Sequence, residues 1–340
     1  MSLFEARKVL RVGAKSYAVS IPKKWASALG LKPGDMVDVI LDKNGYIIIK
    51  PRRAAENVVL ANAVTIDAGS MSKEELFKAI EGSYIEGYDV VKITGIAEPE
   101  ILAAELITKV TTRLPGTVVL EEPDGITIKV ALSEGVVSLG EIVQKMLSVM
   151  NNMYSRMMDF LSKPSVRSLG EKILILDDEL DRMYFLGLRI IKKQLVKARA
   201  SDVASSEELR ALVDATLLIK AIEHVGDSLD RSVRVLLEEP EIAERFGDKL
   251  LELYRMSMKL VLDAVNSYRN ADLRQALKVM AARREYKRRI AELRQAAKQL
   301  EQVGALLNVL QELELVGAVA MDIVDVAISR SASAFGSGKK

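Results

Sequence analysis

The feature that most constrains this chain is a helical pattern that runs almost unbroken from residue 136 to residue 331. Breaks fall at Lys163-Pro164-Ser165 and Ala200-Ser201-Asp202, and Pro240 separates a first trio of helices from a second. Long helices joined by short links favour antiparallel bundles, and three helices followed by three indicate an internal duplication. The predicted parts are residues 136–239, residues 240–331 and a frayed Ser/Gly-rich tail, 332–340.

Helix starts in the first trio follow a capping pattern, in which a serine precedes an acidic residue and an apolar run. The predicted starts are Ser138-Leu139-Gly140-Glu141, Ser168-Leu169-Gly170-Glu171 and Ser206-Glu207-Glu208-Leu209. The second trio is predicted at Ile242–Asn270, Asp272–Gln299 and Glu301–Arg330. A run of methionines at helical spacing in the first helix (Met146, Met150, Met153 and Met157) is expected to pack in the core rather than bind through sulfur.

Composition excludes several kinds of chemistry. The chain has 340 residues, no cysteine and one histidine, so disulfides, thiolate metal sites and cysteine nucleophiles are impossible. Any metal must therefore be held mainly by carboxylates, which suit hard or borderline cations. The sequence has no run of 18 apolar residues and no signal-peptide core at its start, which predicts a cytoplasmic protein without membrane insertion.

Two pairs of carboxylates are candidate metal ligands. Asp177 and Asp181 lie four residues apart in a predicted helix from Glu171 to Ala200, and Glu223 and Asp227 repeat this spacing. Residues at that spacing share one helix face, where like charges repel, so a cation or a basic partner is expected nearby. The cation would be Mg, Mn, Fe, Zn or Ca. The alternative is neutralisation by Arg182, Lys220, Arg231 or neighbouring bundles. His224 is expected to be structural; the alternatives are that it is a ligand or an outer support of the site.

Charge is distributed unevenly along the chain. Residues 1–53 carry eleven Lys/Arg and four Asp/Glu, a net charge of +7, whereas the remainder carries a net charge of −5. A basic head on an acidic body suggests that the head binds nucleic acid.

The head is predicted to contain short strands around one short helix. Strands are expected at Lys8–Val12, Tyr17–Ile21, Met36–Leu41 and Tyr46–Lys50, with a helix from Lys23 to Leu29 and a hairpin turn at Asn44-Gly45. Elements this short bury little surface on their own, so a second copy is expected to complete the fold.

The head resembles the AbrB/MazE-type (SpoVT/AbrB) swapped-hairpin domain. The resemblance rests on Lys8-Val9-Leu10-Arg11-Val12-Gly13, Ser20-Ile21-Pro22-Lys23-Lys24, Leu29-Gly30-Leu31-Lys32-Pro33-Gly34-Asp35 and Ile47-Ile48-Ile49-Lys50-Pro51. It implies a homodimer in which two chains interleave into a small β-barrel that binds DNA. The DNA-binding residues it implies are Arg7, Lys8, Arg11, Lys15, Lys23 and Lys24. A head used only for dimerisation is the alternative.

Residues 57–132 are predicted to form a small α/β domain. Strands are expected at Val58–Ile66 and Asp89–Ile93, helices at Ser72–Gly87 and Glu98–Arg113, and a hairpin around Pro123-Asp124-Gly125. The segment has no Gly-rich phosphate loop, and both a spacer and a ligand-sensing role remain open.

The helical body resembles PhoU, the phosphate-uptake regulator. Asp177-Asp178-Glu179-Leu180-Asp181-Arg182-Met183-Tyr184-Phe185-Leu186 and Ile222-Glu223-His224-Val225-Gly226-Asp227 are similar to its two signature helices. The resemblance implies tandem three-helix bundles with metal on one surface, and control of a Pst-type phosphate transporter or its signalling partners. The whole chain is similar to archaeal PhoU-like regulators with an AbrB-type head.

The second bundle departs from this motif. The corresponding helices read Glu285-Tyr286-Lys287-Arg288-Arg289 and Glu314-Leu315-Val316-Gly317-Ala318, so Arg289 and Ala318 replace the second carboxylate of each pair. A metal cluster is therefore expected only in the first bundle.

These observations predict a multidomain DNA-binding regulator of phosphate homeostasis, not an enzyme. One alternative is a protein-only adaptor whose head serves for dimerisation. The other is a carboxylate-bridged metalloenzyme, which the absence of any Glu-x-x-His pair disfavours.

Overall fold

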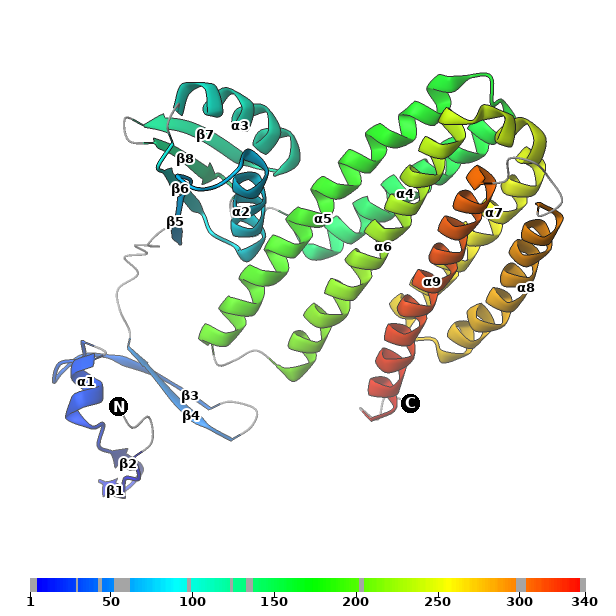
Figure 1. Ribbon diagram of the computed structural model, residues 1–340. Helices are drawn as coiled ribbons and strands as arrows, with labels where there is room; N and C mark the ends of the chain where they lie inside the picture. The colour runs from blue at the N-terminus through cyan, green and yellow to red at the C-terminus, as the bar shows by residue number, and fades with distance from the viewer. Residues whose placement is uncertain are drawn as a thin grey trace. The chain divides into compact units, whose positions relative to one another are not determined.

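A computed structural model describes residues 5–28, 30–41, 45–51, 62–96, 99–122, 125–132, 137–201, 205–297 and 304–336. The chain divides into two compact units, Met1–Leu60 and Ala61–Lys340. Figure 1 shows the strand-rich head, a small α/β region and six long helices, which is the order of parts that the sequence predicts.

The described residues of the head form two separate hairpins and one short helix. Strands β1 (Val9–Val12) and β2 (Ser16–Val19) form the first, and β3 (Val37–Leu41) and β4 (Ile47–Pro51) the second. Between them lies helix α1 (Lys23–Ala28). The predicted elements are confirmed, although Leu29 and turn residues 42–44 lie outside the described part. Within the single chain the described strands do not close into a barrel.

The α/β region forms one four-stranded sheet in the order β5-β6-β8-β7. Its elements are β5 (Ala63–Asp67), α2 (Lys73–Glu86), β6 (Val90–Thr94), α3 (Pro99–Arg113), β7 (Thr117–Glu122) and β8 (Gly125–Val130). Strand β5 begins at Ala63 rather than at the predicted Val58, and residues 52–61 lie outside the described part, as do Pro123 and Asp124. The pair β5–β6 is parallel and the other two pairs are antiparallel.

Local signals account for the bounds of α2. Ser72 and Glu75 form the predicted capping box, which satisfies two backbone N–H groups at the helix start. Gly87 ends the helix with a φ of 102°, a left-handed conformation that favours glycine. The apolar faces of α2 and α3 then bury the sheet, with Phe77 and Ile80 in the shared core.

The described part of the body forms six helices in two consecutive trios. These are α4 (Leu139–Ser162), α5 (Arg167–Ser201), α6 (Ser206–Glu238), α7 (Pro240–Asn270), α8 (Leu273–Ala297) and α9 (Gly304–Gly336). Within each trio every helix contacts the other two, and the trios also pack on each other through α6 with α9 and α4 with α7. The predicted pair of three-helix bundles is confirmed. No described helix combines the length and hydropathy that a membrane span requires.

Several predicted helix boundaries are wrong. Helix α5 begins at Arg167, so Ser168 lies inside it instead of preceding it, and α7 begins at Pro240 rather than at Ile242. The predicted boundaries at Glu98, Gln299 and Glu301 lie outside the described residues.

The cap of α6 is Ser205, whose side chain accepts from the backbone N–H of Glu208, one residue before the predicted start. Helix α9 continues to Gly336 instead of ending at Arg330, so residues 332–336 of the expected tail are helical. Ser331 is only 2% exposed, and burial in the bundle outweighs the weak helix propensity of the Ser-rich sequence.

Packing between the α/β region and the body depends on one buried arginine. Arg189 of α5 is 3% exposed and donates to the carbonyl oxygens of Tyr84 and Tyr88, each at 2.8 Å, and to Asp89 Oδ1 at 2.6 Å. Phe185, one turn earlier on α5, completes the apolar core of the α/β region. Helix α5 therefore belongs to both cores.

Candidate functional site

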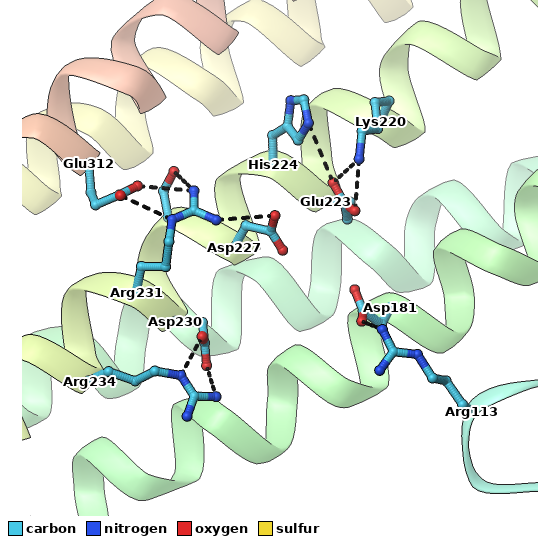
Figure 2. A network of polar contacts seen from close by, with 11 residues as sticks. Arg113, Asp181, Lys220, Glu223, His224, Asp227, Asp230, Arg231, Arg234 and Glu312 are labelled. Carbon is cyan, nitrogen blue, oxygen red and sulfur yellow. Dashed lines mark hydrogen bonds and ion pairs between the residues drawn. The ribbon is translucent and has the colours of Figure 1, made fainter. Parts of the chain in front are cut away.

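Helices α5 and α6 bring three of the four predicted metal ligands together. Asp181 lies on α5, Glu223 and Asp227 lie on α6, and one oxygen of each carboxylate is within 4.8 Å of the others. We call these three residues the acidic cluster (Figure 2). Asp177, the fourth candidate, is not part of it. Its Oδ1 lies beside Gly226, 3.4 Å from the position that a Cβ would occupy there.

Gly226 lets the two helices approach closely enough to form the cluster. A Cβ on this residue would lie 2.3 Å from Leu180 Cδ2, which is too close for any side chain. Leu180 is fully buried in the bundle core and has little freedom to move. The glycine therefore permits Glu223 and Asp227, on the same helix, to reach Asp181.

Each carboxylate of the cluster has a basic partner. The pairs are Arg113 Nη2 with Asp181 Oδ2 at 3.0 Å, Lys220 Nζ with Glu223 Oε2 at 2.8 Å, and Arg231 Nη1 with Asp227 Oδ2 at 3.3 Å (Figure 2). Arg231 also binds Glu312 of α9 at 3.0 Å, which links the cluster to the second bundle.

Two of these partners match the alternative predicted from the sequence. Lys220 and Arg231 neutralise the cluster as expected, whereas Arg182 makes no ion pair with it. Arg113 takes that role and comes from α3 of the α/β region, far away in the sequence. His224 Nε2 lies 3.9 Å from Glu223 Oε2, which is beyond hydrogen-bonding distance.

Burial makes the ionised state of these carboxyls costly. It raises the pKa of Asp177 to about 8, and the negative charges of Asp230, Asp181 and Asp227 add to the effect. Burial also raises the pKa of Asp181 to about 6, although the Arg113 guanidinium opposes the shift. The pKa of Glu223 is raised by burial as well, against the effect of its hydrogen bond from Lys220.

The donor set of the cluster fits a hard cation. Oxygen ligands surround such ions at about 2.0–2.6 Å, so two oxygens on opposite sides of one ion are about 4–5 Å apart. The separations in the cluster fall within this limit. A cation would also offset the buried negative charge, although it would compete with Arg113, Lys220 and Arg231 for the same oxygens.

Sequence reasoning missed a second acidic position beside the cluster. Asp230 is 8% exposed and forms two hydrogen bonds with Arg234, of 2.7 and 2.9 Å. It is also the strongest charged neighbour of Asp177. The spacing of Glu223, Asp227 and Asp230 places all three on one face of α6, and this signal was available in the sequence.

The structure corrects how the two bundles correspond. Buried positions of α5 and α8 match in the pairs Gly170/Ala276, Ile173/Val279, Leu180/Tyr286, Gly187/Leu293 and Ile191/Ala297. Gly317 of α9 also lies against Tyr286 as Gly226 lies against Leu180. The residue that corresponds to Asp181 is therefore Lys287, not the predicted Arg289, and Arg283 corresponds to Asp177.

This correspondence strengthens the expectation for the second bundle. Two basic residues stand where the first bundle has the Asp177/Asp181 pair, and Ala318 stands at the position of Asp227. Glu285, which the sequence suggested as a ligand, instead forms ion pairs with Arg288 at 2.6 Å and Arg289 at 2.9 Å.

The side chains of the six DNA-binding candidates in the head are exposed. They are Arg7, Lys8, Arg11, Lys15, Lys23 and Lys24. Arg7 pairs with Glu5 at 2.8 Å, and Arg11 Nε donates to the carbonyl oxygen of Gly13 at 3.3 Å. Both contacts lie at the surface, where such interactions are weak and are readily exchanged for a phosphate.

Two family models match the chain. "Antidote-toxin recognition MazE, bacterial antitoxin" covers residues 10–57, and "PhoU domain" covers residues 143–235, which include the acidic cluster. The chain thus joins a MazE-type segment to a PhoU domain, and both resemblances inferred from the sequence are confirmed.

Two solved structures resemble the body. The crystal structure of PhoU from Pseudomonas aeruginosa is 16% identical with a TM-score of 0.50, and covers 57% of this chain and 96% of that one. The phosphate transport system regulatory protein PhoU from Streptococcus pneumoniae is 15% identical with a TM-score of 0.47, and covers 57% and 95%. At 16% identity the first likeness establishes a shared fold. No curated protein matches the chain.

Proposed function

We propose that this chain is a DNA-binding regulator of phosphate uptake, in which the head binds DNA and the PhoU-domain body senses a signal or docks on a partner. The observation that carries the proposal is the joining of a basic MazE-type segment and a PhoU domain in one chain. A head that binds DNA places this activity in the cytoplasm.

Charge and exposure support DNA binding by the head. The six candidate side chains are exposed, and the net charge of +7 over residues 1–53 contrasts with the acidic remainder. Lys and Arg contacts with phosphates supply affinity that weakens with salt, while Arg7 and Arg11 offer the fork that reads guanine in the major groove.

Exposed apolar residues support a homodimer formed through the head. Tyr17 is 76% exposed, Leu41 is 74% exposed and Ile47 is 69% exposed, all on strands or their hairpins. Each two-stranded hairpin leaves its outer strand edges free, and exposed apolar strands of this kind bury their surface by pairing with another chain. A second copy would cover them and place two basic surfaces on one DNA duplex.

The acidic cluster supports a cation site in the body. Its three carboxylates, from two helices, would hold one divalent ion through oxygen, and Asp177 would remain outside as a neighbouring acid. The ion would add positive charge beside Arg113, the residue through which the α/β region contacts the cluster. A signal at the body could thus reach the region that precedes it in the chain.

The test of the proposal is the salt dependence of DNA binding. Fluorescence anisotropy of a labelled duplex should show that Arg7→Ala/Arg11→Ala weakens binding. The same variant should flatten the slope of log K against log salt by about one unit for each phosphate that it no longer neutralises. Lys172→Ala/Arg210→Ala removes the same charge from exposed positions of the body and should leave both quantities unchanged.

The opposing result is equally specific. If the wild-type chain does not retain DNA at low salt, or if the head variant keeps the wild-type slope, the head serves for dimerisation alone. The chain would then be a protein-only adaptor.

A further inference from the structure

Helices α3 and α5 line an open cleft of about 770 Å³. Its walls are formed by Ala104, Glu105, Thr108, Lys109, Thr112 and Arg113 of α3, with Asp178, Asp181 and Arg182 of α5. Small-molecule sites typically enclose about 300–1,000 Å³, so the cleft has the size of a site for a small organic molecule. It opens beside the acidic cluster, with which it shares Asp181.

The acidic residues of the cleft are mostly paired already. Asp181 binds Arg113 at 3.0 Å, and Glu105 binds Lys73 at 2.7 Å. Asp178 is the remaining carboxylate, and it is exposed to solvent.

The basic side chains of the cleft have hydrogen-bond donors that are not paired with a carboxylate of the described residues. Neither Lys109 nor Arg182 forms an ion pair with any carboxylate of the described residues, and Lys109 Nζ instead lies 4.2 Å above the ring of Phe77. The Nε atoms of Arg182 and Arg113 are buried and have no hydrogen-bond partner in the described part of the chain. Arg113 Nε lies 3.6 Å from Glu81 Oε2, which is too far for a hydrogen bond. A buried donor without a partner is costly, so a small rearrangement that let an acceptor reach these two nitrogens would be favourable.

The chemistry of these donors selects an oxyanion. Two guanidinium groups and an ammonium group suit the several oxygens of a phosphoryl group, which accepts charge-assisted and bidentate hydrogen bonds. Thr112 adds a hydroxyl, and the aliphatic stems of Lys109 and Arg182 offer apolar contact to an attached organic part. A free phosphate ion would fill only a small share of the volume.

We propose that the cleft binds a small phosphorylated organic molecule, whose phosphoryl group is held by the side chains of Arg182 and Lys109. The cleft adjoins the acidic cluster at Asp181, but its proposed ligand is an anion held by other residues, so the proposal goes beyond the proposed function. Because its walls come from both the α/β region and α5, a bound ligand would link those two parts. Binding needs no DNA, and its outcome is independent of whether the head binds DNA.

The test is isothermal titration calorimetry on the full-length protein without DNA. The probes are adenosine monophosphate, ribose 5-phosphate, inorganic phosphate and adenosine. A phosphate ester should bind saturably, adenosine should not, and Arg182→Gln or Lys109→Gln should each weaken binding about tenfold. Lys172→Gln, an exposed lysine of α5 outside the cleft, should bind like the wild type. Thermal melting checks that each variant folds.

The arms of the experiment separate the outcomes. Binding of inorganic phosphate alone, abolished in Arg182→Gln, would support the anion site and identify the free ion as its ligand. Equal binding of adenosine and its monophosphate would overturn the proposal, because the phosphoryl group would then contribute nothing. Failure of all three phosphate-bearing probes to bind at millimolar concentration would overturn it, as would wild-type affinity in both Arg182→Gln and Lys109→Gln.

Discussion

The two helical bundles share a burial pattern but carry opposite charges at several corresponding positions. Asp177, Asp178 and Asp181 of α5 correspond to Arg283, Arg284 and Lys287 of α8. On the other motif helix, the register set by Gly226 and Gly317 pairs Arg231 with Asp322 and Arg234 with Asp325. Acids of α5 are therefore exchanged for bases of α8, and bases of α6 for acids of α9.

The comparison shows which part of the motif the fold requires. Both bundles keep the glycine that lets two helices approach, together with the large residue it faces, Leu180 or Tyr286. The charged positions are free to invert because they lie at the edge of the core, where neutralisation needs only opposite signs on facing helices. Arg294 and Glu314, at 2.8 Å, provide such a pair in the second bundle. The three-helix bundle therefore does not require the acidic cluster in order to fold.

A second difference explains why the α/β region packs on only one bundle. Helix α5 presents Phe185 and Arg189 to that region, whereas α8 has Ala291 and Gln295 at the corresponding positions. Neither replacement can provide the buried aromatic ring or the guanidinium that donates to two backbone carbonyls and a carboxylate.

The largest expected effect on stability comes from replacing Arg189 of α5 by glutamine, the residue that α8 has at the corresponding position. Arg189→Gln should destabilise the packing of the α/β region on α5 by about 3–5 kcal/mol, because it removes a buried guanidinium and its three charge-assisted hydrogen bonds, although Lys193 still pairs with Asp89. Hydrogen exchange of α2, together with urea unfolding, measures the loss.

Lys192→Gln is the matched control for that change. Lys192 pairs with Glu86 at the surface of the same contact, so its replacement should cost less than about 1 kcal/mol. Similar losses in the two variants would show that Arg189 does not hold the regions together.

The shared glycine should be the next most sensitive position. Gly226→Ala places a methyl group against Leu180 and should destabilise the protein by about 1–3 kcal/mol, and Gly317→Ala should act similarly through Tyr286. Gly82→Ala in α2 meets no atom within 4 Å and should stabilise by about 0.5–1 kcal/mol. Denaturant midpoints compare the three, and tolerance of Gly226→Ala would contradict the proposed close approach.

The pH dependence of stability should distinguish the acidic bundle from the basic one. The folded-state pKa values of Asp177 and Asp181 are raised to about 8 and about 6, above their values in an unfolded chain. Their contribution to the free energy of unfolding is therefore fully present below about pH 4, and it is lost as the pH rises through those pKa values. Melting temperature in the presence of a chelator should fall by a few degrees between pH 5 and pH 8.

Asp177→Asn should flatten this profile, because it removes the group with the larger shift. Arg283→Asn, at the corresponding position of α8, should leave the profile as in the wild type. An unchanged slope in Asp177→Asn would show that the carboxyl is not perturbed as the structure indicates.

The smallest expected effect comes from removing Arg113, whose positive charge competes with a metal ion for Asp181. Arg113→Gln removes the positive charge 3.0 Å from this carboxylate and should tighten Mn²⁺ binding about tenfold. Arg210→Gln, an exposed change of equal charge, should leave Mn²⁺ affinity unchanged. Equal affinity in Arg113→Gln and the wild type would place the ion elsewhere.

Much of the fold was predictable because its signals are local. Capping serines at residues 72 and 138, Pro240 and the helical periodicity located the helices. The end of α9 was not predictable in the same way, since burial of Ser331 against the other helices overrides a composition typical of a tail.

The candidate site was predictable only in part. The spacing of Glu223 and Asp227 indicated a shared face, but it could not show that Asp177 lies outside the cluster or that Arg113 enters from α3. In the second bundle the Glu285/Arg289 spacing imitated the motif, and only the packing of Gly317 on Tyr286 established the register. Contacts between segments distant in sequence leave no local signal.

The most direct test of this account is Mn²⁺ binding by variants that exchange the residues of the two bundles. Equilibrium dialysis with metal analysis should find about one Mn²⁺ per wild-type chain. The variant Asp181→Lys/Asp227→Ala, which carries the residues of the second bundle at these two positions, should bind no Mn²⁺. Arg283→Gln/Lys287→Gln should keep the wild-type value. Undiminished Mn²⁺ in Asp181→Lys/Asp227→Ala, or no Mn²⁺ on the wild-type protein, would contradict the assignment of a single cation site to the first bundle.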